Sequence, residues 1–200
     1  MTSTVKAQDQ PPIEEDSGQF FPTPFPRDNN GWLPPLYDFP LALSPHDHFF
    51  FIRPIEENGL TWPLHDYRYG YYFETLGNVH TGIDLQAPLN HPVVAAASGK
   101  VVFAGYGLLK GANSTDDPYG IAVMLRHDFG FDGYTLYTVY AHLAKPSVRT
   151  GQRVEIGDEI GLVGMTGMTS GPHLHFEVRL KSEDDDRIQN PELWLLPPVG

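Results

Sequence analysis

The chain has 200 residues, of which 19 are proline, 20 are glycine, nine are histidine and none is cysteine. Without cysteine the sequence excludes disulfides, thiolate metal sites and a cysteine nucleophile, so a metal site would need His, Asp or Glu ligands. The net charge of −12, with neither a basic cluster nor an apolar run of about 18 residues, predicts no nucleic-acid partner and no membrane span in this chain.

Residues 1–45 form a proline-rich, acidic segment that we interpret as a leader rather than a domain. Its nine prolines disfavour a regular helix or a central strand through most of its length. Aromatic residues such as Phe20, Trp32 and Tyr37 make it too apolar for a free linker. We expect its later part to pack on the folded body and its first ~15 residues to be mobile. A leader that occludes the functional site is the alternative.

From residue 48 onward the sequence changes to short β-type runs separated by turns. No segment shows a helical period, and glycine and proline recur throughout, so we predict a mainly β body with antiparallel sheets. This body is expected to cover residues 46–195, with a tail at 196–200. The expected strands are 48–53, 93–97, 100–104, 121–127, 134–142, 154–156, 159–163 and 172–180.

Further local features bear on how the body is built. Alternation within 134–142 is expected to place Leu136, Tyr140 and His142 on one side of the strand. Residues 106–119 make a loop long enough to serve as a functional rim. The acidic run at 183–186 is interpreted as a solvated turn, and the apolar residues 193–196 are expected to dock back onto the body.

The first candidate site is the pair His80 and Asp84, separated by three residues. On an extended segment this even spacing places both side chains on one side, where they can reach a single ion. The spacing alone is weak evidence, because such pairs also arise by chance on protein surfaces.

The second candidate is His173-Leu174-His175, followed by Phe176, Glu177 and Val178. In a strand the apolar residues at 174, 176 and 178 face the core, so both imidazoles point the opposite way. His142, at the end of the 134–142 run, is the third candidate. A second His-x-His pair, His46 and His48, lacks flanking alternation and is a weaker metal candidate.

Two imidazoles and one carboxylate, with a water in the fourth position, are a ligand set typical of catalytic zinc. Zinc lowers the pKa of its bound water to about 7, and a nearby base must then accept the proton. His142 and one of the pair His173 and His175 remain for that task. The chain has no His-Glu-x-x-His motif, so Glu177 is interpreted as a supporting strand residue rather than the base.

Three motifs occur in this order: His80-x-x-x-Asp84, Tyr140-Ala141-His142-Leu143 and Gly171-Pro172-His173-Leu174-His175-Phe176-Glu177. Together they resemble the motifs of the lysostaphin/LytM-type zinc endopeptidases. The connecting residues are similar as well, including Arg68-Tyr69-Gly70 before the first motif and Gly151-x-x-Val154-x-x-Gly157 between the second and third. The resemblance covers residues 50–192.

The resemblance implies a sheet domain with a narrow groove, in which His80, Asp84 and His175 bind Zn²⁺. It further implies that His142 and His173 act as general base and transition-state stabiliser, without deciding which residue has which role. The implied reaction is hydrolysis of peptide bonds in peptidoglycan stem peptides or cross-bridges. All five positions are intact, so we expect an active enzyme.

A non-catalytic or latent LytM-like domain that binds the cell wall or regulates another hydrolase is the alternative. An enzyme that cuts the cell wall acts outside the cytoplasm, so we expect an extracytoplasmic location. The first 18 residues lack the apolar core of a secretory signal, and we therefore expect this chain to be trimmed at its start.

Overall fold

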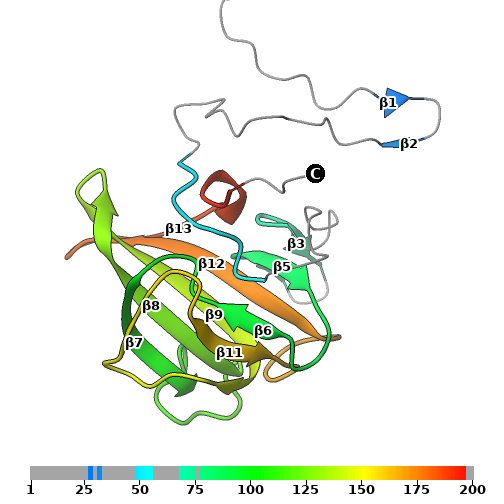
Figure 1. Ribbon diagram of the computed structural model, residues 1–200. Coiled ribbons are helices and arrows are strands. Elements are labelled where there is room, and N and C mark those ends of the chain that lie inside the picture. The colour runs from blue at the N-terminus through cyan, green and yellow to red at the C-terminus, as the bar shows by residue number, and fades with distance from the viewer. Residues whose placement is uncertain (1–26, 29–30, 33–47, 56–67, 75–76, 197–200) are drawn as a thin grey trace, which may run out of the picture. The chain divides into compact units, whose positions relative to one another are not determined.

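Figure 1 shows the computed structural model of the chain, which describes residues 27–28, 31–32, 48–55, 68–74 and 77–196. The chain divides into two units, Met1–Pro35 and Leu36–Gly200. In the first, β1 (Arg27–Asp28) pairs antiparallel with β2 (Gly31–Trp32). The rest of the predicted leader lies outside the described residues, as do residues 197–200 of the predicted tail, so the domain bounds remain predictions.

The regular elements in the described part of the second unit are strands except for one short 3₁₀ helix, which confirms the mainly β prediction. The strands before residue 107 are β3 (Tyr72–Phe73), β4 (Asn78–Val79), β5 (Ile83–Gln86), β6 (Pro92–Val94) and β7 (Gly99–Tyr106). They are followed by β8 (Ile121–Phe131), β9 (Tyr134–Pro146), β10 (Arg153–Val154), β11 (Glu159–Val163), β12 (His173–Lys181) and β13 (Asp186–Gln189), and then by the short 3₁₀ helix η2 (Pro191–Leu193). No helix in the described ranges has the length and apolar character needed to cross a membrane.

Nine of these strands form one antiparallel sheet (Figure 1). One edge of β9 pairs with two different strands in turn, and the point where the partner changes is called the fork in β9. The first part of β9 pairs with β12, from Thr135 opposite Lys181 to Ala141 opposite His175. Its last part pairs with β11, from Leu143 to Pro146. The other edge of β12 pairs with β5 and with β13. The fork therefore falls at His142, the residue between the two pairings.

The apolar face of β12 forms part of the core, as the alternation in its sequence predicts. Leu174, Phe176 and Val178 are buried in the main hydrophobic cluster, and the Phe176 ring contacts Tyr140 of β9. The predicted docking of residues 193–196 is confirmed, since Trp194 and Leu195 are buried in the same cluster. The opposite face of β12 is therefore the one that carries the histidines.

The predicted strand at 48–53 is wrong, because the only β-bridge in these residues is an isolated parallel one between Phe51 and Leu195. Phe49 has a φ of 31°, a left-handed conformation that interrupts extended backbone. The aromatic residues instead pack on the end of the chain, with the His48 and Phe50 rings against Trp194. The aromatic residues at 48–53 therefore indicate side-chain packing and not a strand.

The buried residue His127 predicts a pH dependence of folding stability. Its Nδ1 lies 3.0 Å from the carbonyl oxygen of Ser98, and its Nε2 lies 2.9 Å from Oγ1 of Thr138. Burial lowers the pKa of His127 below its ordinary value, more than the bond to Ser98 raises it. The unfolded chain thus binds a proton below about pH 6.5 that the folded chain does not, and stability falls as the pH drops through that value.

We expect the urea midpoint of the wild type to decrease between about pH 8 and about pH 5.5, and to decrease less in His127→Gln. Comparison of the two proteins at both pH values isolates this residue from the other titrating groups. Equal decreases in both proteins would contradict the assignment.

Candidate metal centre

Three side chains of the first and third motifs, His80, Asp84 and His175, meet at the edge of β12. His175 stands directly opposite Asp84 in the pairing of β12 with β5, and His80 precedes β5 by three residues. Nε2 of His80 lies 3.1 Å from Oδ1 of Asp84 and 3.0 Å from Nδ1 of His175. Nδ1 of His175 lies 2.9 Å from the same Asp84 oxygen. All three side chains are buried, so their ligand atoms form one enclosed cluster.

The backbone around His80 fixes its position. The amide of Gly70 donates to the carbonyl oxygen of His80 at 2.9 Å, and the amide of His80 donates to that of Tyr71 at 2.7 Å. Gly82 lets β5 approach β12 closely, because a Cβ there would lie 2.3 Å from the carbonyl oxygen of Phe176. The Arg68-Tyr69-Gly70 stretch noted in the sequence thus lies against the first motif and holds it.

Each of the imidazoles of His80 and His175 has an inner nitrogen that faces the cluster and an outer nitrogen that faces away from it. The hydrogen bond of the outer nitrogen determines whether the inner nitrogen carries a proton or a lone pair. Nδ1 of His80 is 2.9 Å from the carbonyl oxygen of Arg68, and Nε2 of His175 is 3.1 Å from Oε1 of Glu177. Both partners only accept, so each outer nitrogen carries the proton and each inner nitrogen presents a lone pair. Together with the Asp84 oxygen, these lone pairs face a common point, an arrangement that a cation stabilises.

The donor geometry fits zinc. Two ligand atoms at ~2.0–2.1 Å from a tetrahedral zinc ion are about 3.3 Å apart, close to the separations of 2.9–3.1 Å found here.

In the absence of a cation, a proton on His175 takes the place of the cation in the cluster. Burial opposes charging of His175, but hydrogen bonds to Asp84 and Glu177 outweigh burial and raise its pKa to about 9. For Asp84 the bonds from His175 and His80 likewise overcome burial and lower the pKa of its carboxyl.

A β-bulge in β9 places the side chain of His142 in the same site. The expectation that His142 shares a side of the strand with Leu136 and Tyr140 is therefore wrong. The register between β8 and β9 shifts between Ile121 opposite Leu143 and Val123 opposite Tyr140, so β9 contains one extra residue. His142 has a φ of +61°, which turns its side chain to the face that carries His173 and His175. A strict two-residue period would have placed its imidazole in the core.

The two remaining imidazoles are also held by acceptors. Nδ1 of His142 lies 2.9 Å from the carbonyl oxygen of Thr166, and Nδ1 of His173 lies 2.9 Å from that of Gly171. Their ring centroids are 4.8 Å apart, and Nε2 of His173 lies 3.5 Å from Oδ1 of Asp84. Burial, followed by the charges of His175 and His173, lowers the pKa of His142 to about 4. At neutral pH His142 is therefore an uncharged imidazole beside the three-donor cluster.

The structure thus brings together all five residues singled out in the sequence. His46 and Asp47 lie outside the described residues, and His48 packs against Phe131 and Trp194. Sequence reasoning missed the buried Arg179 and Tyr119, which both contact Glu177. Arg179 continues the alternation of His173, His175 and Glu177 along one face of β12 and was detectable. Tyr119 comes from the 107–120 loop, and only tertiary structure shows its role.

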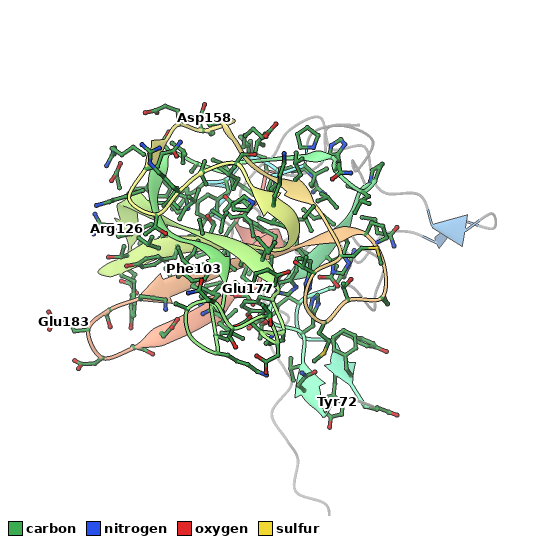
Figure 2. All side chains as sticks on the ribbon, turned by 90° about the horizontal axis from the view of Figure 1, so that it is seen from below. Tyr72, Phe103, Arg126, Asp158, Glu177 and Glu183 are labelled. Atoms are coloured by element: carbon green, nitrogen blue, oxygen red, sulfur yellow. The ribbon has the colours of Figure 1, made fainter. Side chains whose placement is uncertain are left out.

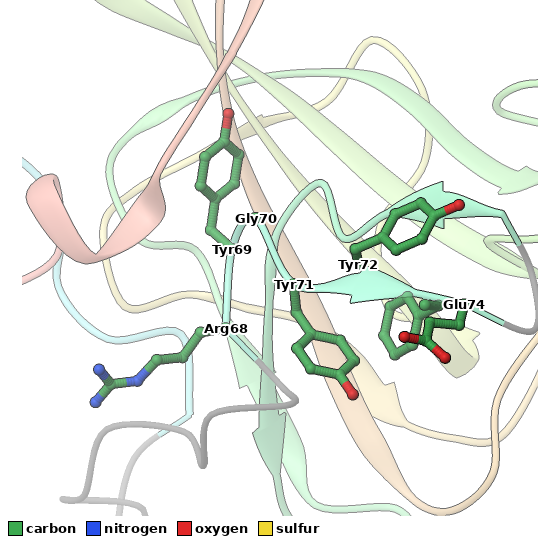
Figure 3. Close-up of a pocket in the computed structure, with 7 residues that line it drawn as sticks. Arg68, Tyr69, Gly70, Tyr71, Tyr72 and Glu74 are labelled. Carbon is green, nitrogen blue, oxygen red and sulfur yellow. The ribbon is translucent and has the colours of Figure 1, made fainter.

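An open pocket is formed by the segment that precedes the first motif. It has a volume of ≈ 710 Å³ and is lined by Arg68, Tyr69, Gly70, Tyr71, Tyr72, Phe73 and Glu74 (Figure 3). The Phe73 ring lies 5.6 Å from the His80 ring, and the Tyr72 side chain is exposed. In Figure 2, Tyr72 lies at the periphery of the molecule and Glu177 in its interior. Residues 68–74, which contact His80, therefore also line a pocket that is open to solvent.

Comparisons with known proteins show the family of this chain. The model of a family described as Peptidase family M23 matches residues 78–189, a range that contains the five candidate site residues. The DD-carboxypeptidase/endopeptidase Mpg of Neisseria meningitidis is 44% identical over 105 residues, covering 52% of this chain and 21% of that protein. The peptidoglycan DD-endopeptidase ShyA of Vibrio cholerae is 38% identical over 100 residues, covering 50% of this chain and 20% of that protein. The chain spans about a fifth of the length of these curated relatives.

Among solved structures, the catalytic domain of the antimicrobial peptidase lysostaphin from Staphylococcus simulans is similar. Its TM-score is 0.51 and its sequence identity is 32%, with coverage of 63% of this chain and 86% of that domain. The family match covers more than half of the chain, and the fold agrees with it. The chain belongs to peptidase family M23.

Proposed function

We propose that this chain is a zinc-dependent endopeptidase in which His80, Asp84 and His175 bind the metal and His142 and His173 act on the reacting groups. The observation that carries the proposal is the convergence of three buried donors whose outer nitrogens are held by acceptors. The donor set of two imidazoles and one carboxylate leaves a fourth position for the reaction, as catalytic zinc requires.

Zinc supplies Lewis-acid chemistry when bound, because it makes water a nucleophile near neutral pH and polarises a carbonyl. The protein supplies the proton transfer and the stabilisation of negative charge. Nδ1 of His142 and of His173 each donate to a backbone carbonyl, so Nε2 of each imidazole is left to act. One of them accepts the proton of the attacking water, and the other, protonated, donates a hydrogen bond to the developing oxyanion.

The proposed substrate is a peptide of peptidoglycan, in the stem or the cross-bridge. Support comes from the relatives, whose names include a DD-carboxypeptidase/endopeptidase and a peptidoglycan DD-endopeptidase. A peptidase with this substrate acts outside the cytoplasm, so we also propose an extracytoplasmic location.

The test is incubation of the purified chain with purified peptidoglycan, followed by mass spectrometry of the soluble products. We expect peptide-bond cleavage that disappears after treatment with a chelator and returns on addition of zinc. Cleavage that persists after complete metal removal would contradict the mechanism. Binding to peptidoglycan without any product would instead favour the non-catalytic alternative.

A further inference from the structure

Glu177 is a fully buried carboxylate directly behind the cluster of His80, Asp84 and His175. Its Oε1 lies 3.1 Å from Nε2 of His175 and accepts from Oγ1 of Thr81 at 2.5 Å and from the hydroxyl of Tyr119. An isolated buried carboxylate is strongly unfavourable, so the fold must compensate this charge.

Arg179 compensates it from the same face of β12. Its Nε and Nη2 both lie 2.7 Å from Oε2 of Glu177, and Nη2 also donates to the hydroxyl of Tyr119 at 3.0 Å. The three side chains form a closed ring in which each contacts the other two. The two oxygens of Glu177 therefore face different partners, with Oε1 towards His175 and Oε2 towards Arg179.

This division matters because an imidazole can bind a metal through either nitrogen. An acceptor at Nε2 keeps the proton there and leaves Nδ1 as the donor atom. His80 is held by a backbone carbonyl, which no substitution of a side chain removes. His175 depends on the side chain of Glu177, so its orientation is set by a residue that does not itself reach the cluster.

We propose that Glu177 is a positioning residue that fixes His175 as an Nδ1 metal ligand, and that Arg179 serves to compensate the buried charge of Glu177. The inference deepens the proposed function and rests on it. It separates two contributions within one network: Glu177 determines metal affinity, and Arg179 determines the stability of the fold around it.

The experiment measures Zn²⁺ affinity, by competition with a chromophoric chelator, and the urea midpoint of the metal-free protein. The variants are Glu177→Gln, Arg179→Met and the double variant, with Glu159→Gln as the matched control at an exposed glutamate of β11. We expect Glu177→Gln to lower zinc affinity by roughly 10- to 100-fold, because the outer partner of His175 loses its charge. The control should bind zinc as the wild type does.

Arg179→Met leaves the Glu177 carboxylate buried beside fewer partners, so we expect a lower urea midpoint with zinc affinity near that of the wild type. The double variant removes both charges, so its midpoint should exceed that of Arg179→Met while its affinity stays at the level of Glu177→Gln. Absorption spectra of the Co²⁺ forms provide a second readout, and Glu177→Gln is expected to alter the d–d bands where Arg179→Met does not.

Wild-type zinc affinity in Glu177→Gln would overturn this proposal alone. A parallel loss of affinity and stability in all three variants would also overturn it, because it would indicate only a structural network. A wild-type chain that takes up no zinc would overturn both this proposal and the proposed function.

Discussion

Loss of both zinc binding and peptidase activity is the expected result of His80→Ala and of Asp84→Asn. Each change removes one of three donors that lie within 3.1 Å of one another. Removal of an outer partner of a ligand already costs ~10- to 100-fold in affinity, so removal of the ligand itself should cost more. Metal content after dialysis and cleavage of purified peptidoglycan measure the two effects.

Asp116→Asn is the matched control for Asp84→Asn. Asp116 is exposed on the 107–120 loop, where its carboxylate contacts Lys110 and Ser114. This variant is expected to retain zinc and activity. Full activity in His80→Ala would refute the assignment of the metal ligands, and loss of activity in the control would point to a different site.

Replacement of His142 by Ala is expected to reduce kcat by ~10²- to 10⁴-fold while one zinc per chain is retained. His142 is beside the three-donor cluster, its ring 5.7 Å from that of His175, but it is not one of the three donors. Steady-state kinetics on a peptide substrate, together with metal analysis of the same sample, measure both quantities. Zinc loss in parallel with activity would show that His142 is a ligand.

His142→Gly is the matched variant for the backbone. Both substitutions remove the imidazole, so both should lose the same activity. Because His142 has a φ of +61°, glycine fits the conformation that costs alanine ~1–2 kcal/mol, and the Gly variant should unfold at higher urea. Equal midpoints would indicate that the bulge relaxes when the imidazole is removed.

The parts of the site that follow from local pattern were predictable from the sequence. Alternation around His173 and His175 correctly placed Leu174 and Phe176 in the core and both imidazoles on the other face. The even spacing of His80 and Asp84 also indicated two side chains that reach one point. The prediction for β12 succeeds because a two-residue period is an intrinsic property of extended backbone. His80 precedes β5 and the backbone bends at Gly82, so its approach to Asp84 does not follow from that period alone.

The parts that depend on pairing between distant strands were not predictable in this way. The bulge at His142 arises from the register of β9 against β8, which no short window of sequence encodes. Tyr119 reaches Glu177 across 58 positions of sequence, from a loop without a periodic pattern. Resemblance to a family singled out His142, whose ring lies beside those of His173 and His175, although the alternation of the strand predicted the opposite face for it.

The fork in β9 gives the two parts of the proposed active site different neighbouring strands. The three donors are set by the pairing of β12 with β5, whereas the carbonyl partner of His142 is Thr166, which follows β11. His142 directly follows Ala141, which stands opposite His175, so β9 links the two parts through neighbouring residues. A substitution confined to Thr166 is therefore expected to displace the His142 imidazole while the three donors stay in place.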